Sequence, residues 1–204
     1  MLKKRPFIRI ILIFVVVLTG LIFVYPVCRE TYLGFLIKTG NHYMSAPGKD
    51  ALVLFKENEG NKDLDLILYI GNSAKMKKDI KSAYYLITKA STFYLAWIEF
   101  ALMMALIIAS PVPIIRKLIA LVAGFAIVHL IVFLKLLIQV NYVCNHNPGL
   151  EILMHSPARM KVIDLLQDQF VDTVQPSLIL VFIIWMLITF RMKDYRKLMA
   201  TKVK

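Results

Sequence analysis

Four long blocks of apolar residues, separated by polar segments, organise the chain. They cover residues 10–28, 93–115, 118–143 and 176–190. The first block has nineteen residues without a charge, and as an α-helix it would extend about 28 Å, close to the roughly 30 Å hydrocarbon layer of a bilayer. The pattern therefore predicts four transmembrane helices, the last of them short.

The first block follows a basic N-terminus, as the apolar core of a signal peptide would. It is longer than such a core, which has about 7–15 residues. Its last residues, Tyr25-Pro26-Val27-Cys28, also offer no small-x-small cleavage site. We therefore expect a retained membrane anchor.

Lysine and arginine concentrate in three of the segments that flank these blocks. Residues 1–9, 116–117 and 191–204 together carry twelve of them and a single acid. The positive-inside rule places these segments in the cytoplasm and residues 29–92 and 144–175 outside. The prediction is a multi-pass protein of the cell inner membrane with both termini cytoplasmic. A rival arrangement makes the fourth block an interfacial helix.

The larger outside segment has apolar patterns of its own. Residues 31–44 have helical spacing, whereas leucine and isoleucine occupy every second position along residues 64–70. Together with residues 51–55, across a turn-rich string, the latter predict a β-hairpin. A lysine-rich stretch from Asn72 through Lys89 predicts a helix that leads into the second block.

The smaller outside segment predicts an amphipathic helix that begins at Ser156-Pro157, with serine as the cap and proline at the first helical position. The expected fold class is therefore mainly α. It is a polytopic membrane protein with four transmembrane helices and a small outside-facing α+β segment, made of a helix plus a β-hairpin.

Composition agrees with a membrane protein and argues against nucleic acid as a partner. Of the 204 residues, 59% are hydrophobic and 19% charged, against about 45–50% and about 25% in soluble domains. The net charge of +12 could suggest nucleic acid, but the basic residues flank the apolar blocks, so we expect the bilayer and no nucleic acid. There is no P-loop, dinucleotide fingerprint or nucleophile elbow, and no cofactor is expected.

Three ionisable residues, Glu99, His129 and Lys135, lie inside apolar blocks, where charges are costly and tend to mark function. Counted from the outer ends of their blocks, Glu99 is about 9 Å deep and Lys135 about 12 Å. The two could therefore form a structural ion pair between spans. Lys135 could instead snorkel outward, and His129 could be a neutral packing residue. A small transporter that uses all three is an alternative function.

The two cysteines, Cys28 and Cys144, fall at the outer ends of the first and third blocks. They could form a disulfide in an oxidising compartment, or both could be free. With His146, His155 and Arg159 nearby in sequence, a membrane thiol enzyme using Cys144 or Cys28 is a second alternative. The spacing matches no metal-site pattern, so no metal is expected.

Asp164, Asp168 and Asp172 recur at every fourth position of the smaller outside segment. On an α-helix they form an acidic stripe. This stripe is either a solvated face or a docking face for a basic partner. The exposed edge of the hairpin is a second candidate contact surface.

The whole layout resembles the small polytopic proteins encoded beside exosortases, in particular the exosortase H-associated membrane proteins. A basic N-terminus precedes an anchor that ends Tyr25-Pro26-Val27-Cys28-Arg29-Glu30-Thr31-Tyr32, followed by the helix-plus-hairpin segment and three further spans. The active-site cysteine and arginine pattern of exosortases has no match here. The resemblance therefore implies an accessory role in protein sorting and no catalytic residue.

The leading hypothesis is a non-enzymatic membrane accessory protein. Its outside loops would bind a membrane-embedded partner, such as an exosortase-type enzyme, or the substrate of that partner. The thiol enzyme and the small transporter remain the alternatives, and the oligomeric state is left open.

Overall fold

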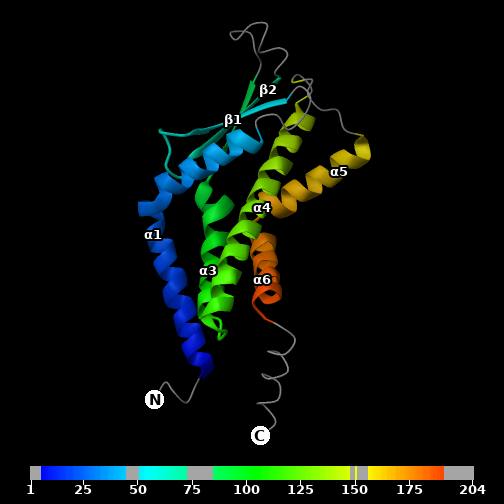
Figure 1. Cartoon of the computed structure of the whole chain (residues 1–204). Coiled ribbons are helices and arrows are strands. Elements are labelled where there is room, and N and C mark those ends of the chain that lie inside the picture. Colours follow the sequence, from blue (N-terminus) through cyan, green and yellow to red (C-terminus); the bar gives the residue numbers. More distant parts are fainter. Residues whose placement is uncertain (1–5, 45–50, 73–84, 148–149, 151–155, 191–204) are drawn as a thin grey trace. The chain divides into compact units, whose positions relative to one another are not determined.

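The computed structural model describes residues 6–44, 51–72, 85–147, 150 and 156–190, which form helices and one small sheet (Figure 1). The chain divides into two compact units. We call the first the apolar unit; it comprises Met1–Val24, Ile98–Leu130 and Gln175–Lys204. We call the second the sheet unit; it comprises Tyr25–Trp97 and Ile131–Val174.

The first helix, α1, runs unbroken over Pro6–Tyr43 and contributes to both units. Two separate helices were expected, at residues 10–28 and 31–44, and the expected break between them is wrong. Pro26 lies inside α1, where it removes the hydrogen bond to the carbonyl of Ile22 without ending the helix. The boundary between the two units falls at this weakened turn, after Val24.

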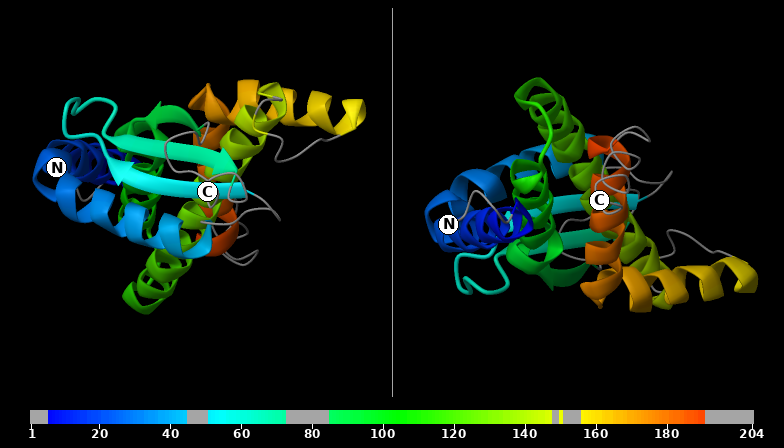
Figure 2. Two further views of the ribbon diagram at one scale, coloured as in Figure 1. Left: turned by 90° about the horizontal axis from the view of Figure 1, so that it is seen from above. Right: turned by 90° about the horizontal axis from the view of Figure 1, so that it is seen from below.

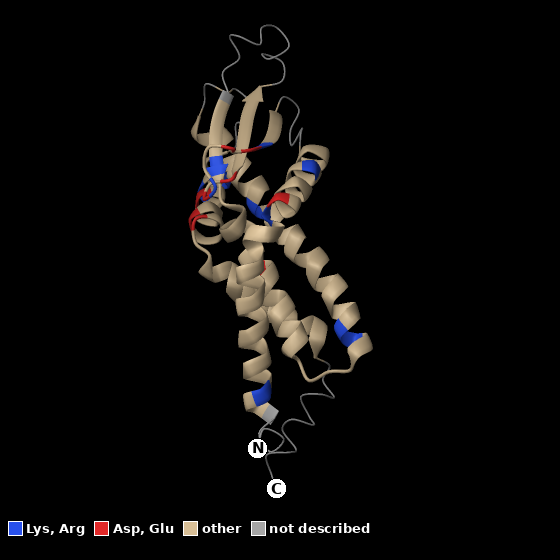
Figure 3. Cartoon of the chain, turned by 90° about the vertical axis from the view of Figure 1, so that its left-hand side faces the viewer, with Lys and Arg blue, Asp and Glu red and all other residues tan. Residues whose placement is uncertain are grey.

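The apolar unit contains helices with few charges. Besides the first part of α1, it holds α3 (Ile98–Ala109), the first part of α4 (Ile114–His146) and α6 (Gln175–Thr189). Figure 3 shows the described charges sparse on these helices and more frequent in the sheet unit.

Close contacts join α3 to its neighbours in the apolar unit. Trp185 of α6 donates an indole N–H to the hydroxyl of Ser110, at 2.9 Å. On α4, Gly124 allows α3 to pack closely, because a Cβ at position 124 would lie only 3.0 Å from the Met103 side chain and 3.1 Å from the Ile107 side chain. A larger residue at position 124 would push these side chains away.

Among the described residues, two helices are long and apolar enough to cross a membrane, Phe7–Tyr43 and Ile114–His146. Their length and composition support a membrane protein. Phe93–Ala109 is a shorter apolar stretch, and Pro157–Val171 and Gln175–Thr189 qualify only as a pair, bent by 77°. The spans expected at 93–115 and 176–190 are therefore helical but not established as crossings, and the four-span arrangement stays a prediction.

The sheet unit contains a three-stranded antiparallel sheet, in the order β1-β2-β3. The strands are β1 (Ala51–Glu57), β2 (Leu66–Asn72) and β3 (Tyr85–Ala90). The predicted hairpin is confirmed as β1 and β2, with Phe55 opposite Leu68. The third strand adds Thr88 opposite Leu68 on the other side.

The prediction of a helix from Asn72 through Lys89 is wrong at both ends, which are the parts of this stretch that the structure describes. Asn72 is the last residue of β2, and Lys89 lies in β3; residues 73–84 lie outside the described part. The sequence of β3, Tyr-Leu-Ile-Thr-Lys-Ala, is rich in aromatic and β-branched residues, which suit strands. The third strand also stabilises the sheet, because a lone two-stranded hairpin is only marginally stable in water.

One face of the sheet is buried. The apolar residues of β1 and β2 on that face are at most 2% exposed: Ala51, Val53, Phe55, Leu66, Leu68 and Ile70. The last turns of α1 pack close to β1 (Figure 2), since a Cβ at Gly40 would lie only 2.9 Å from the ring of Phe55. From α4, Gln139 donates to the hydroxyl of Thr88 at 3.1 Å. These contacts build the core of the sheet unit.

The outer edge of β1 is closed by a side chain. Asn41 of α1 accepts the backbone N–H of Phe55 at 2.7 Å. It also donates its amide to the carbonyl of Phe55 at 3.0 Å. A single side chain thus makes both bonds that a neighbouring strand would make at this position.

Candidate functional site

A polar cluster within the sheet unit centres on Asp65, which is fully buried. Its carboxylate accepts the Nε–H of Arg29 at 3.1 Å and the hydroxyl of Tyr25 at 3.1 Å. It also accepts the backbone N–H of Thr92 at 2.8 Å and the hydroxyl of Thr92 at 2.6 Å. The cluster therefore connects α1, the turn before β2 and the segment after β3.

The positive charge of Arg29 in this cluster is balanced by nearby carboxylates. The Arg29 side chain is 13% exposed, and its Nη2 also lies 3.7 Å from a carboxylate oxygen of Glu57, at the end of β1. Asp65 and Arg29 form a buried ion pair that is also hydrogen-bonded, which is the arrangement a buried charge requires. The cluster is suited to fixing α1 onto the sheet.

Aromatic rings pack beside the polar cluster. The ring of Tyr25 lies 5.0 Å from Phe93 and 5.4 Å from Trp97, and Tyr32 lies 5.2 Å from Trp97. Tyr25, Arg29 and Tyr32 have the i, i+4, i+7 spacing of one helix face. Sequence reasoning did not identify this site, although that spacing within residues 25–32 was the signal that could have done so.

The ionisable residues of the apolar blocks are buried, as their positions suggest. Glu99 is fully buried at the start of α3, and Lys135 is 3% exposed on α4. They belong to different units, and the ion pair between them stays a prediction. His129 donates from Nδ1 to the Phe125 carbonyl at 2.8 Å and lies against the Phe125 ring. The packing role expected for His129 stays a prediction.

Both cysteines are free thiols in the structure, Cys28 half-buried and Cys144 buried. The disulfide between them is not formed here, and it stays a prediction for the oxidised protein. His146 donates from Nδ1 to the Tyr142 carbonyl, and its Nε2 lies 3.5 Å from Asp164. The burial of Cys144 limits access to it as a nucleophile.

The rest of the expected thiol site is described only in part. His155 lies outside the described residues, whereas Arg159 lies on α5 (Pro157–Leu166). Within the described part of the chain, no group of three His, Cys, Asp or Glu side chains could hold a metal ion.

The expected acidic stripe is interrupted. Asp164 lies on α5 and contacts His146. The next residues, Gln167–Val171, form a π-helical turn, η4. Its i→i+5 hydrogen bonds put more residues in each turn than an α-helix has, so the four-residue spacing of the aspartates no longer keeps them on one face. Asp172 accepts the side-chain amide of Gln167 at 3.0 Å. The three carboxylates therefore do not share one regular α-helical face.

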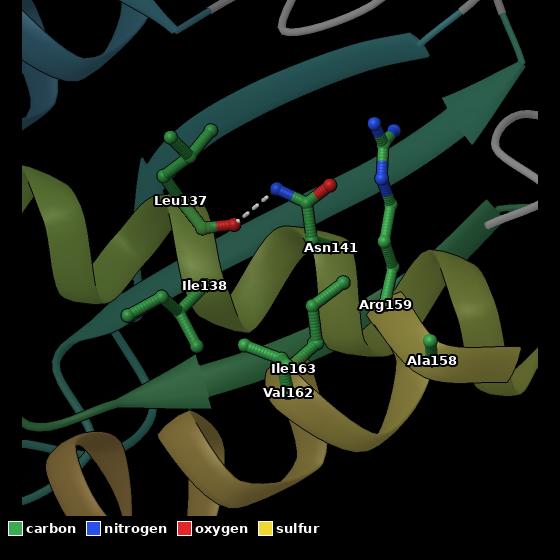
Figure 4. Close-up of a pocket in the computed structure, with 7 residues that line it drawn as sticks. All are labelled: Leu137, Ile138, Asn141, Ala158, Arg159, Val162 and Ile163. Atoms are coloured by element: carbon green, nitrogen blue, oxygen red, sulfur yellow. Dashed lines mark hydrogen bonds between the residues drawn. The ribbon is translucent and has the colours of Figure 1, made fainter. Parts of the chain in front are cut away.

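An open groove of about 450 Å³ lies between α4 and α5. Leu137, Ile138 and Asn141 line it from α4, and Ala158, Arg159, Val162 and Ile163 line it from α5 (Figure 4). Its lining is apolar apart from Asn141 and Arg159. No sequence motif pointed to this groove, because it depends on how two helices distant in sequence pack together.

No protein-family model, curated protein or solved structure matches this chain.

Replacing Asp65 by Asn should destabilise the protein by about 3 kcal/mol, because Arg29 loses the charge that compensates its burial. Tyr25→Phe should cost less, about 1 kcal/mol, because it removes a neutral hydroxyl whose two partners, Asp65 and Thr92, keep other hydrogen bonds. Thermal unfolding in detergent measures both effects. Asp63→Asn, an exposed change two residues away, is the matched control. If Asp65→Asn lowers the stability no more than this control does, the polar cluster does not fix α1 onto the sheet.

If Glu99 and Lys135 pair, Glu99→Gln and Lys135→Met should each lower the amount of folded protein. The double variant should recover most of it, since neither charge is then buried alone. Fluorescence-detected size exclusion of the detergent-extracted protein measures the folded amount. Losses that simply add in the double variant would show that the two side chains act independently.

Proposed function

We propose that this protein is a non-enzymatic membrane accessory protein that binds an extended segment of a membrane partner along the outer edge of β3. The proposal rests on a difference between the two edges of the sheet: a side chain occupies one of them, and the other has no pairing strand in the part of the chain that the structure describes. Asn41 occupies the edge of β1 at Phe55. Beyond β3, no further strand pairs with the sheet among the described residues.

The register identifies the backbone groups of β3 that face away from the sheet. The N–H and carbonyl of Phe55 point to Asn41, so Phe55 and Leu68 form a non-hydrogen-bonded pair. The backbone groups of Leu68 then point to β3, where they meet Thr88. By alternation, Ile87 and Lys89 direct their N–H and carbonyl groups outward, available to an added strand.

The side chains of this edge indicate the partner's chemistry. Ile87 is 51% exposed, and Lys89 is also exposed. Across the sheet, Ile87 continues the row of Leu54 and Tyr69, and Lys89 continues the row of Lys56 and Ile67. An extended segment with an apolar residue opposite Ile87 and an acidic residue opposite Lys89 would complement both rows.

The proposed setting is the inner membrane, with four spans, cytoplasmic termini and the three-stranded sheet outside. The excess of basic residues in segments 1–9, 116–117 and 191–204 supports this orientation. The resemblance to exosortase-associated proteins suggests an exosortase-type enzyme, or its substrate, as the partner.

The test is in-cell photo-crosslinking from position 87, with position 54 as the matched control on the opposite edge strand. We expect one dominant membrane-protein adduct from position 87 and none from position 54. Lys89→Pro should lower this adduct by about tenfold, because it removes an outward N–H and a charge. Lys89→Gln, which keeps the N–H, should lower it less.

Folding controls keep this experiment decisive. Proline is tolerated in an edge strand where its missing N–H faces outward, so Lys89→Pro should stay folded. Thr88→Pro removes a bond of the ladder and should not. Equal adducts from positions 87 and 54, or an adduct that Lys89→Pro leaves unchanged, would contradict binding along β3.

A further inference from the structure

The groove between α4 and α5 has the size of a ligand site. Its volume of about 450 Å³ falls within the roughly 300–1,000 Å³ of known small-molecule sites. Leu137 and Ile138 form one wall, and Val162 and Ile163 form the other. These four side chains offer only aliphatic contacts, so the part of the ligand between them is apolar.

The apolar wall continues onto the exposed surface of a helix that is apolar enough to cross a membrane. Leu134 and Leu137 of α4 are 55% and 38% exposed, and their spacing places them on one face. On α5, Val162 and Leu165 are 57% and 61% exposed. Exposed aliphatic side chains on a membrane helix face lipid chains. Since Leu137 belongs to both surfaces, the lipid-facing surface leads into the groove.

The polar part of the groove carries a positive charge. Asn141, one turn beyond Leu137, donates its amide to the carbonyl of Leu137 at 2.7 Å. Figure 4 shows Asn141 and Arg159 extending to the same side of the groove, above Val162 and Ile163. The nearest acid on α5, Asp164, contacts His146. The guanidinium of Arg159 offers the planar donors that suit a phosphate.

We propose that this groove binds one anionic phospholipid of the surrounding bilayer. The acyl chain lies between the aliphatic walls, and the phosphate is held by Arg159. A free phosphate would leave the aliphatic walls unused, and an uncharged lipid would leave the guanidinium unused. The site is separate from β3, so it does not depend on the proposed partner.

The test is native mass spectrometry of the full chain in detergent, with phosphatidylglycerol or phosphatidylcholine added. Wild-type protein should retain one phosphatidylglycerol in preference to phosphatidylcholine. Arg159→Gln should reduce the retention of phosphatidylglycerol by about tenfold and that of phosphatidylcholine less, because the choline cation already offsets the charge of the phosphate. Lys161→Gln is the matched control, since it removes the same charge from the same helix outside the groove lining.

A second variant, Val162→Trp, tests the groove itself. The added ring should occupy the space between the helices and abolish retention of phosphatidylglycerol, while thermal unfolding stays like that of the wild type because position 162 is exposed. Equal losses in Arg159→Gln and Lys161→Gln would mean diffuse charge attraction and overturn the site. Undiminished retention by Val162→Trp would overturn it as well.

Discussion

The ion pair of Asp65 with Arg29 is the interaction on which the sheet unit depends. A fully buried carboxylate is tolerable only with its four donors in place. Those donors come from α1 and from the segment after β3, so satisfying one charge fixes both against the turn that precedes β2. The position of α1 in turn places Asn41 on β1. The part of α1 from Tyr25 onward and the small sheet thereby become one folded unit.

The sequence predicted the features that depend on local pattern. Apolar blocks predicted the helices, and alternation along residues 64–70 predicted β2. The third strand was missed because the lysines between Asn72 and Lys89 obscured the short β-branched run that pairs with β2. The continuity of α1 past Cys28 was missed because the charged pair Arg29 and Glu30 ends the apolar block, although charged residues do not end a helix.

The candidate sites also divide into those that local sequence pattern indicates and those that depend on tertiary contacts. Burial of Glu99 and Lys135 follows from their place in apolar blocks, so sequence alone could indicate it. The Asp65 cluster and the groove between α4 and α5 join residues far apart in the chain, which no local pattern records. The acidic stripe assumed an unbroken α-helix and did not anticipate the π-turn of η4. Functional proposals here rest on long-range geometry: one edge of the sheet closed by Asn41, the other presenting Ile87 and Lys89.

The central claim is that β3 presents an outward-facing row of backbone groups on a rigid sheet. Residue-resolved hydrogen exchange of the purified protein in detergent tests it most directly. The N–H of Thr88 should exchange slowly because it belongs to the ladder with β2, and those of Ile87 and Lys89 should exchange fast. Uniform protection along β3 would mean that the chain already covers this edge, and would contradict the account.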